Sequence, residues 1–180
     1  MILIINICKE KLHYYEFVKP VEDILQENGA KYFLKHYSEI TEEDLKKADK
    51  IIICGTSPYD NEFIGSSEKF DWLRDVDKPV LGICGGMEII GLIFGGKLKK
   101  KTEIGFYTEK FFKYFLGLKG EKEVYHLHNY HVLFGDDFEV FSKSGNVVQA
   151  VKYKDKNIYG VLFHPEVRNK EMIVRFAKDC

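Results

Sequence analysis

The sequence has few prolines and cysteines and no long apolar run. Its 180 residues include four prolines and four cysteines, and no Pro- or Ser-rich stretch divides the chain, so we expect a single domain over residues 1–180. No apolar segment approaches the ~20 residues that a membrane-spanning helix needs, which predicts no membrane association. Because the cysteines show no CxxC spacing, the sequence predicts neither a zinc site nor a disulfide framework. Free thiols predict a cytoplasmic protein.

The chain also lacks an excess of charge of either sign. Its formal net charge is −1, which provides no electrostatic basis for binding nucleic acid. One basic cluster, Lys97 with residues 99–101, is followed closely by Glu103, and the pattern predicts a solvated surface turn. Hydrophobic residues make up 45% of the chain, enough to form a full core.

The first half of the chain alternates strand and helix signals. Nearly continuous apolar runs predict strands that are covered on both faces at residues 1–7, 51–54 and 80–83, with a shorter strand at 32–34. Helical spacing, capping residues and glycine stops predict helices around residues 18–25, 41–48, 70–73 and 86–94.

The second half is richer in strand signals. Turn residues separate predicted strands at 124–127, 138–141, 147–153 and 158–163, and a closing helix is predicted at 167–178. Together these elements predict an α/β domain with a mainly parallel sheet and some added antiparallel strands. Ligands bind beyond the carboxyl ends of parallel strands, and Gly55, Cys84 and His164 all follow predicted strands, so we expect them at one edge.

Cys84 lies where a predicted strand runs directly into a predicted helix. Gly82 precedes it and Gly85-Gly86 follows it, and such a tight turn needs small neighbours. The turn would project the thiol over the sheet edge, and the helix N-terminus would lower the thiol pKa. The amide of Gly85 could then stabilise an oxyanion. A buried structural cysteine is the alternative, but the G-x-C-G-G pattern favours a nucleophile.

A second chemical motif stands near the C-terminus. His164-Pro165-Glu166 follows the predicted strand that ends at Phe163, and the proline breaks that strand. A histidine held by a carboxylate two residues away is the base and orienting group that a thiol nucleophile needs. The tripeptide alone is weak evidence, but the cysteine turn strengthens it.

The two motifs together resemble those of the class I (triad) glutamine amidotransferases. The family pattern is G-x-C-x-G-[HM]-Q and, later, G-x-Q-F-H-P-E; this chain has G-I-C-G-G-M-E and G-V-L-F-H-P-E. Within the family, the chain most resembles the amidotransferase subunit of GMP synthase, on residues 82–84, 86–87, 94–96, 103–106 and 159–161. The resemblance implies a Rossmann-like (flavodoxin-like) sheet flanked by helices and no cofactor.

The resemblance also implies a reaction and its residues. Cys84 would attack the side-chain amide of glutamine or another γ-glutamyl compound, His164 would pass a proton to the leaving ammonia, and Glu166 would orient His164. A thioester would form and water would release glutamate. The family's second oxyanion donor is a glycine after an earlier strand, which corresponds to Gly55 here, although G-T-S-P replaces the usual G-G-P.

Glu88 departs from the family pattern, which has glutamine at this position. It lies one helical turn after Cys84 on the same face and leans toward it. An ionised carboxylate only accepts hydrogen bonds, whereas glutamine also donates them. Its negative charge would repel a substrate carboxylate and raise the thiol pKa. The alternative is a Glu88 that points to solvent. Leu162, where the family often has glutamine, is interpreted as a packing change.

The family's substrate segment corresponds to residues 124–132. Tyr130 and His131 are our predicted substrate contacts, and Leu127-His128 is the alternative register. His126 and His128 share a strand face, but no carboxylate or thiol lies close in sequence to complete a site, so no metal is predicted.

Three functions remain open from the sequence. No synthetase segment accompanies the motifs, which implies either a separate synthetase partner or a free-standing hydrolase and in itself favours the latter. A glutaminase that feeds a separate ATP-dependent synthetase subunit is the favoured prediction, on the resemblance to GMP synthase. A free-standing γ-glutamyl hydrolase would use the same residues without an ammonia acceptor, and Glu88 favours it. A non-catalytic regulatory domain is the third hypothesis, against which the intact Cys, His and Glu set counts.

Overall fold

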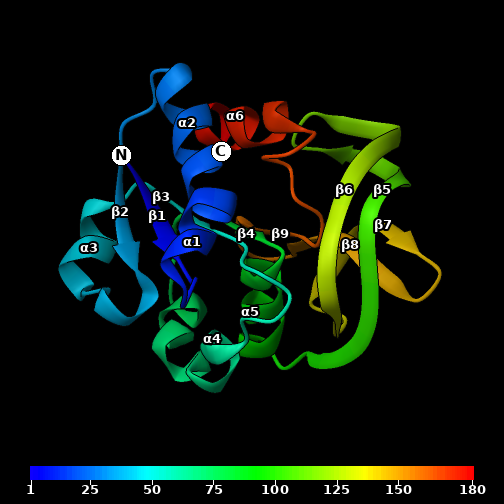
Figure 1. The fold of residues 1–180 in the computed structure, drawn as a ribbon, viewed down its shortest axis with the longest axis horizontal. Coiled ribbons are helices and arrows are strands. Elements are labelled where there is room, and N and C mark those ends of the chain that lie inside the picture. The colour runs from blue at the N-terminus through cyan, green and yellow to red at the C-terminus, as the bar shows by residue number, and fades with distance from the viewer.

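A single mixed sheet runs through the whole molecule. The computed structural model describes all 180 residues, and its nine strands lie in the order β2-β1-β3-β4-β9-β8-β7-β5-β6 (Figure 1). The strands are β1 (Ile2–Asn6), β2 (Tyr32–His36), β3 (Lys50–Ile53), β4 (Val80–Ile83), β5 (Lys97–Phe115), β6 (Leu118–Leu133), β7 (Phe138–Ser144), β8 (Val147–Tyr153) and β9 (Ile158–Val161). The α-helices are α1 (Lys11–His13), α2 (Lys19–Glu27), α3 (Glu42–Lys47), α4 (Glu62–Gly65), α5 (Gly85–Ile93) and α6 (Lys170–Asp179).

The first five strands of that order form a parallel half-sheet. All four pairings from β2 through β1, β3 and β4 to β9 are parallel. This is the flavodoxin-like strand order, with a crossover to each side of β1. Since β4 and β9 pair in register, the residues that follow them reach the same edge of the sheet.

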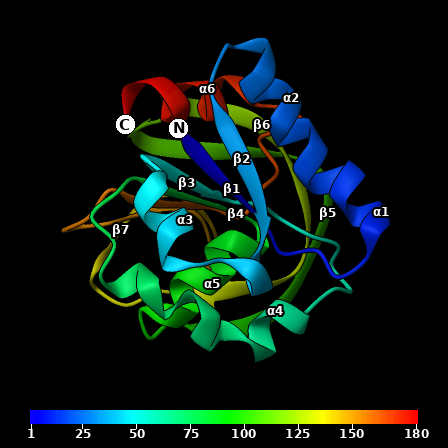
Figure 2. The ribbon, with the colours of Figure 1, turned by 90° about the vertical axis from the view of Figure 1, so that its left-hand side faces the viewer.

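Two apolar cores explain why these strands are apolar on both faces. On β1, Ile2 and Ile4 pack in one core, together with residues of α2 and α6. Leu3 and Ile5, on the opposite face, pack in the second core with residues of α5. Figure 2 shows α2 and α6 on one side of the sheet and α3, α4 and α5 on the other. The predicted strands at 1–7, 51–54 and 80–83 are therefore confirmed.

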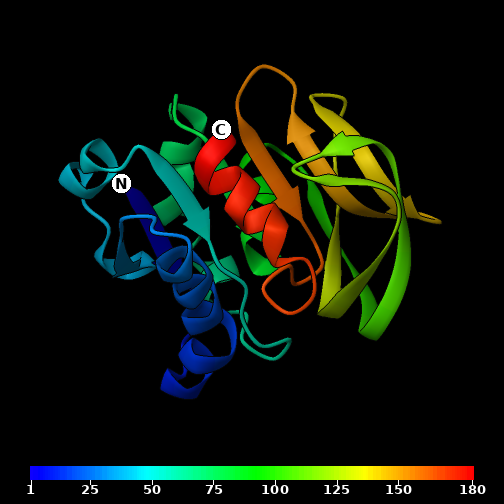
Figure 3. The same cartoon turned by 90° about the horizontal axis from the view of Figure 1, so that it is seen from above.

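The other four strands correct the prediction of a mainly parallel sheet. Every pairing among β9, β8, β7, β5 and β6 is antiparallel, so parallel and antiparallel pairings are equal in number, at four each. The long hairpin of β5 and β6 extends away from the parallel half (Figure 3). The lysines at 97 and 99–101 belong to β5, so the predicted surface turn is wrong; the lysines are solvated on a strand because this part of the hairpin faces water.

The helices follow their sequence signals closely. Thr41 caps α3 with a reciprocal capping box to Asp44, which satisfies two backbone donors at the helix start. Residues 70–73 lie in a 3-10 helix, Ser67–Arg74, rather than in an α-helix. The chain from α1 to α2 is continuous through a π-helical segment, Tyr14–Val18. None of the helices is both long and apolar enough to span a membrane.

Candidate active site

Cys84 lies in a strained turn between β4 and α5. Its backbone has φ +48° and ψ −106°, a left-handed region that non-glycine residues rarely occupy and that concentrates at functional sites. The strand ends at Ile83 and the helix begins at Gly85. Cys84 N–H donates to Val161 O of β9 at 2.7 Å, which ties the turn to the neighbouring strand.

Two glycines allow this turn because they let α5 approach the sheet closely. A Cβ on Gly86 would lie 2.3 Å from Ile53 O, and a Cβ on Gly82 would lie 2.6 Å from Gly86 C and O. No real side chain fits in such spaces. The G-x-C-G-G sequence is therefore a packing requirement for placing Cys84 at the sheet edge, as predicted for a nucleophile turn.

His164 and Glu166 form a buried pair just beyond β9. His164 Nδ1 lies 2.7 Å from Glu166 Oε1, and the two side chains are each 1% exposed. His164 N–H also donates to Tyr125 O of β6 at 2.8 Å. Since Nδ1 is engaged, Nε2 is the nitrogen that remains, and it has no hydrogen-bond partner in the protein.

The charges of this group are strongly coupled. Burial acts to lower the pKa of His164, but the charges of Glu166 and Cys84, together with the hydrogen bond to Glu166, raise that pKa well above its ordinary value. Burial raises the pKa of Cys84 above its ordinary value, and the charge of His164 opposes that rise. The lowered thiol pKa expected at the helix N-terminus is therefore corrected to a raised one, which an imidazolium held by Glu166 limits.

Gly55 packs against both of these side chains. A Cβ at this position would lie 2.8 Å from His164 Cε1 and 3.3 Å from Cys84 Cβ, so only glycine leaves room for the two groups. Gly85 is the first residue of α5, where backbone N–H groups have no partner within the helix. The two predicted oxyanion donors therefore flank Cys84.

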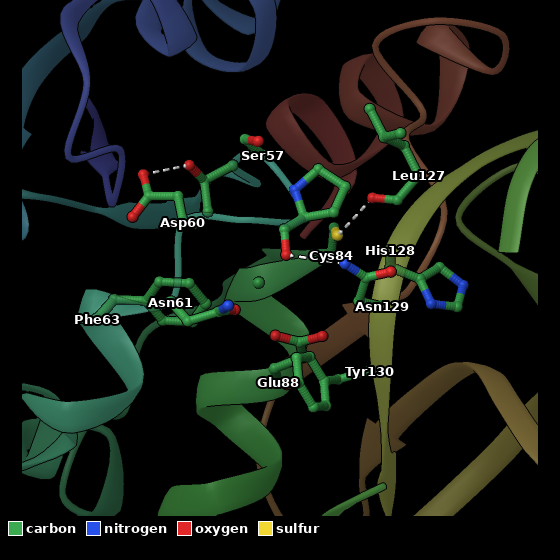
Figure 4. A pocket seen from close by; sticks show the side chains of 13 residues that line it. Ser57, Asp60, Asn61, Phe63, Cys84, Glu88, Leu127, His128, Asn129 and Tyr130 are labelled. Carbon is green, nitrogen blue, oxygen red and sulfur yellow. Dashed lines mark hydrogen bonds between the residues drawn. The ribbon is translucent and has the colours of Figure 1, made fainter. Parts of the chain in front are cut away.

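A narrow pocket opens beside Cys84. Thirteen residues line it: Thr56, Ser57, Pro58, Asp60, Asn61, Phe63, Cys84, Gly85, Glu88, Leu127, His128, Asn129 and Tyr130. Figure 4 shows the thiol of Cys84 beside the main chain of Leu127, with the carboxyl group of Glu88 directed into the pocket from α5.

Glu88 is buried, so the solvent-facing alternative is wrong. It is 5% exposed, lines the pocket and follows Cys84 by one turn of α5, with Glu88 N–H donating to Cys84 O. Burial raises its pKa from 4.5 to about 8, although the charge of His164 opposes the rise. The ionised Glu88 expected from the sequence is therefore corrected to a carboxyl that is mostly neutral at pH 7. In that form it can donate one hydrogen bond, as the family glutamine does.

The predicted substrate segment reaches the pocket through residues 127–130. Tyr130 lines the pocket, as predicted, but His131 does not. Leu127 comes closest to the nucleophile, with its carbonyl oxygen 3.7 Å from Cys84 Sγ, and His128 also lines the pocket. The pocket therefore holds residues of both registers, and which of them contact a substrate stays a prediction.

Asn129 and Asp60 also build the pocket, and sequence reasoning missed both. Asn129 Nδ2 donates to Pro58 O at 3.1 Å, which ties β6 to the loop after β3. Asp60 Oδ2 accepts from Thr56 Oγ1 at 2.8 Å and from Lys9 N–H at 2.6 Å. Neither residue belongs to a catalytic motif. The only sequence signal was that Asn129 lies in the substrate segment and that Asp60 lies close to Gly55.

Comparisons with known proteins agree with this geometry. The family model for glutamine amidotransferase class-I matches residues 13–180. A subunit of glutamine-hydrolyzing GMP synthase from Methanosphaera stadtmanae is 36% identical, over 73% of this chain and 75% of that protein. The glutamine-hydrolyzing GMP synthase of Staphylococcus aureus strain JH9 is 34% identical over 87% of this chain, which spans only 33% of the staphylococcal protein.

Solved structures share the fold. A protein from Thermoplasma acidophilum, described as a subunit of GMP synthase, has a TM-score of 0.86 at 24% identity, over 98% of this chain and 91% of that one. A glutamine amidotransferase from Thermotoga maritima has a TM-score of 0.71 at 21% identity, over 97% and 79%. The predicted resemblance is confirmed: the chain belongs to the class-I glutamine amidotransferase family of enzymes and, within it, is similar to the archaeal GMP synthase subunit from Methanosphaera.

Proposed function

We propose that this chain is the glutamine-hydrolysing subunit of a GMP synthase-type enzyme, with Cys84, His164 and Glu166 as its catalytic triad. The observation that carries the proposal is the strained turn at Cys84. This turn lies at the same edge of the sheet as the buried His164–Glu166 pair, which follows β9. Membership of the amidotransferase family and the similarity to the Methanosphaera GMP synthase subunit support it.

The chemistry follows from the positions of these groups. Cys84 Sγ attacks the carboxamide carbon of glutamine, and the backbone amides of Gly55 and Gly85 stabilise the resulting oxyanion. His164 gives a proton to the leaving amine, so ammonia departs and a γ-glutamyl thioester remains. Water, deprotonated by His164, then attacks the thioester and releases glutamate and the Cys84 thiolate. Glu166 accepts from Nδ1–H throughout and keeps Nε2 toward the reaction.

The pocket is proposed to hold the rest of the substrate. The neutral carboxyl of Glu88 takes the place of the family glutamine and donates a hydrogen bond to the substrate. Tyr130 and the backbone around Leu127 border the same space, so they are placed to contact the amino acid part of glutamine. His131, the other predicted substrate contact, does not line this pocket.

The ammonia acceptor is proposed to be a separate ATP-dependent synthetase subunit, in the cytoplasm. The relative from Methanosphaera is named as one subunit of its enzyme, and the staphylococcal GMP synthases are about three times as long as the segment that this chain matches. All four cysteines are unpaired, which suits a reducing compartment.

An ammonia-release assay tests the proposal. The purified chain is given glutamine or other γ-glutamyl amides, with and without the synthetase subunit of a GMP synthase, its nucleotide substrate and ATP. We expect glutamine hydrolysis that the synthetase accelerates. Equal turnover of γ-glutamyl compounds with no effect of the synthetase would instead establish the free-standing hydrolase, and no turnover of any amide would establish a regulatory domain.

A further inference from the structure

A cluster of histidine and carboxylate side chains lies between β5 and β6, outside the proposed triad. Glu103 pairs directly with His128 across the antiparallel ladder, and Gly105 pairs with His126. The carboxylate that the sequence lacks beside the two histidines therefore comes from the neighbouring strand. Glu103 is 8% exposed, His126 0% and His128 1%.

Three potential ligand atoms of this cluster converge. His128 Nε2 lies 3.2 Å from Glu103 Oε2 and 3.2 Å from His126 Nδ1, and His126 Nδ1 lies 3.7 Å from Glu103 Oε2. Tetrahedral zinc with bonds of about 2.0–2.1 Å places its ligand atoms about 3.3–3.4 Å apart. The three measured separations bracket that spacing, so one ion can contact all three atoms with little movement.

Further polar side chains contact the three residues. The other nitrogen of His126, Nε2, lies 3.3 Å from Glu109 Oε1, and Ser144 Oγ donates to Glu109 Oε2 at 2.6 Å. Gln149 Nε2 donates to Glu103 Oε2 at 3.0 Å. Carboxylate–histidine pairs of this kind fix the tautomer and orientation of metal-ligating imidazoles.

The balance of charge also favours a cation. Glu103 and Glu109 are both buried, and neither lies within ion-pair distance of a lysine or arginine. Buried carboxylates without a permanent positive partner are costly.

We propose that Glu103, His126 and His128 bind one divalent transition-metal ion, with Zn²⁺ as the best match to two imidazoles and one carboxylate. Two protein nitrogens and one oxygen leave the fourth position to water. The ion would fix the part of β6 that carries Leu127 and Asn129. The ring of His128 extends away from Cys84 (Figure 4), so this site is distinct from the thiol.

The test measures metal binding in a protein that cannot turn over. Metal-free Cys84→Ala protein is titrated with Zn²⁺ in competition with a chromogenic chelator, which also removes the thiol of the active site as a ligand. We expect one Zn²⁺ per chain. His128→Ala or Glu103→Gln should weaken binding by more than about 100-fold, and Glu109→Gln by about 10–100-fold, as the loss of an outer partner of a metal ligand does. His36→Ala and Glu121→Gln, which alter a histidine and a carboxylate outside the cluster, should leave binding unchanged.

A spectroscopic measurement protects the test against variants that fail to fold. Co²⁺ added to the Cys84→Ala protein should give the visible absorption of a tetrahedral site without sulfur-to-cobalt charge transfer. Absence of stoichiometric Zn²⁺ binding, binding that survives the cluster substitutions, or a sulfur charge-transfer band would each overturn the proposal in favour of a hydrogen-bonded histidine pair. Because turnover is not measured, these results stand apart from the outcome for the proposed glutaminase.

Discussion

His164 holds Glu166 at 2.7 Å through Nδ1, while its other nitrogen has no partner among the protein's own atoms. The bond fixes which nitrogen remains for chemistry. Strand β9 already ends at Val161, and the turn that contains Pro165 brings the Glu166 carboxylate back to the ring. The geometry supports the proposed division of roles, in which Glu166 orients the ring and His164 transfers protons.

Removing the thiol should abolish turnover without unfolding the protein. Cys84→Ala keeps the Cβ of residue 84 and deletes only the attacking sulfur, so we expect no ammonia release and an unchanged circular dichroism spectrum. Cys180→Ala is the matched control and should retain activity, because Cys180 lies at the end of α6. A glutamine-analogue electrophile should modify Cys84 alone. Turnover by folded Cys84→Ala protein would contradict the nucleophile assignment.

The two partners of the thiol should differ in their effect. His164→Ala removes the general base, so we expect kcat to fall by about 10²–10⁴-fold. Glu166→Gln keeps a hydrogen-bond acceptor and should cost less than His164→Ala. Steady-state kinetics at saturating glutamine measure both. A tenfold loss of kcat is already less than a general base usually contributes. If neither variant lowers kcat by at least roughly tenfold, His164 is not the base.

Gly55 should tolerate no side chain. Gly55→Ala would place a methyl group 2.8 Å from His164 Cε1, so the imidazole must shift. Because a misplacement of about 1 Å can cost ~10²-fold in rate, we expect a loss of that order in kcat/KM with the fold kept. Gly65→Ala is the control, since nothing lies within 4 Å of a Cβ there. Equal kinetics for the two variants would remove Gly55 from the reaction centre.

The sequence predicted the parts of the site that local motifs encode. Cys84 sits in a turn whose glycines are required by close packing, and His164 and Glu166 are two residues apart. Both motifs can therefore be recognised without knowing which strands pair. Strand β5 could not be predicted because its lysine-rich first part has weak strand signals and is held by its long pairing with β6. A register shift between Lys100 and Glu103 brings Glu103 opposite His128. No spacing along the chain reveals that contact.

Burial of Glu88 should make stability depend on pH. Its pKa is about 8 in the folded protein and near 4.5 when exposed, so the folded state binds the proton more tightly. The stabilisation is complete below about pH 4.5 and is lost as pH rises toward 8, by at most roughly 1.4 kcal/mol per pH unit. Glu88→Gln should therefore become more stable relative to the native protein as pH rises from 5 to 8. Denaturant unfolding across this range measures the difference, and a constant difference would mean that Glu88 is not protonated.

The pH dependence of activity should follow the same proton. Below about pH 8, neutral Glu88 donates a hydrogen bond to the substrate, much as the family glutamine does, so native protein and Glu88→Gln should have similar KM values for glutamine near pH 6–7. Above that pH, the ionised carboxylate repels the substrate carboxylate and disfavours the Cys84 thiolate.

The native rate should consequently fall as pH rises through about 8, whereas Glu88→Gln should keep its activity to higher pH. The sequence alone led to an ionised Glu88 that raises the thiol pKa; burial instead keeps the carboxyl neutral below about pH 8. Loss of one hydrogen bond and the added repulsion should raise the native KM for glutamine by about tenfold as the pH rises through about 8, equivalent to roughly 1.4 kcal/mol. Glu171→Gln, which alters the first turn of α6, should leave the profile unchanged. Superimposable profiles for native protein and Glu88→Gln would remove Glu88 from the site, and glutaminase activity only in Glu88→Gln would mean that glutamine is not the native substrate.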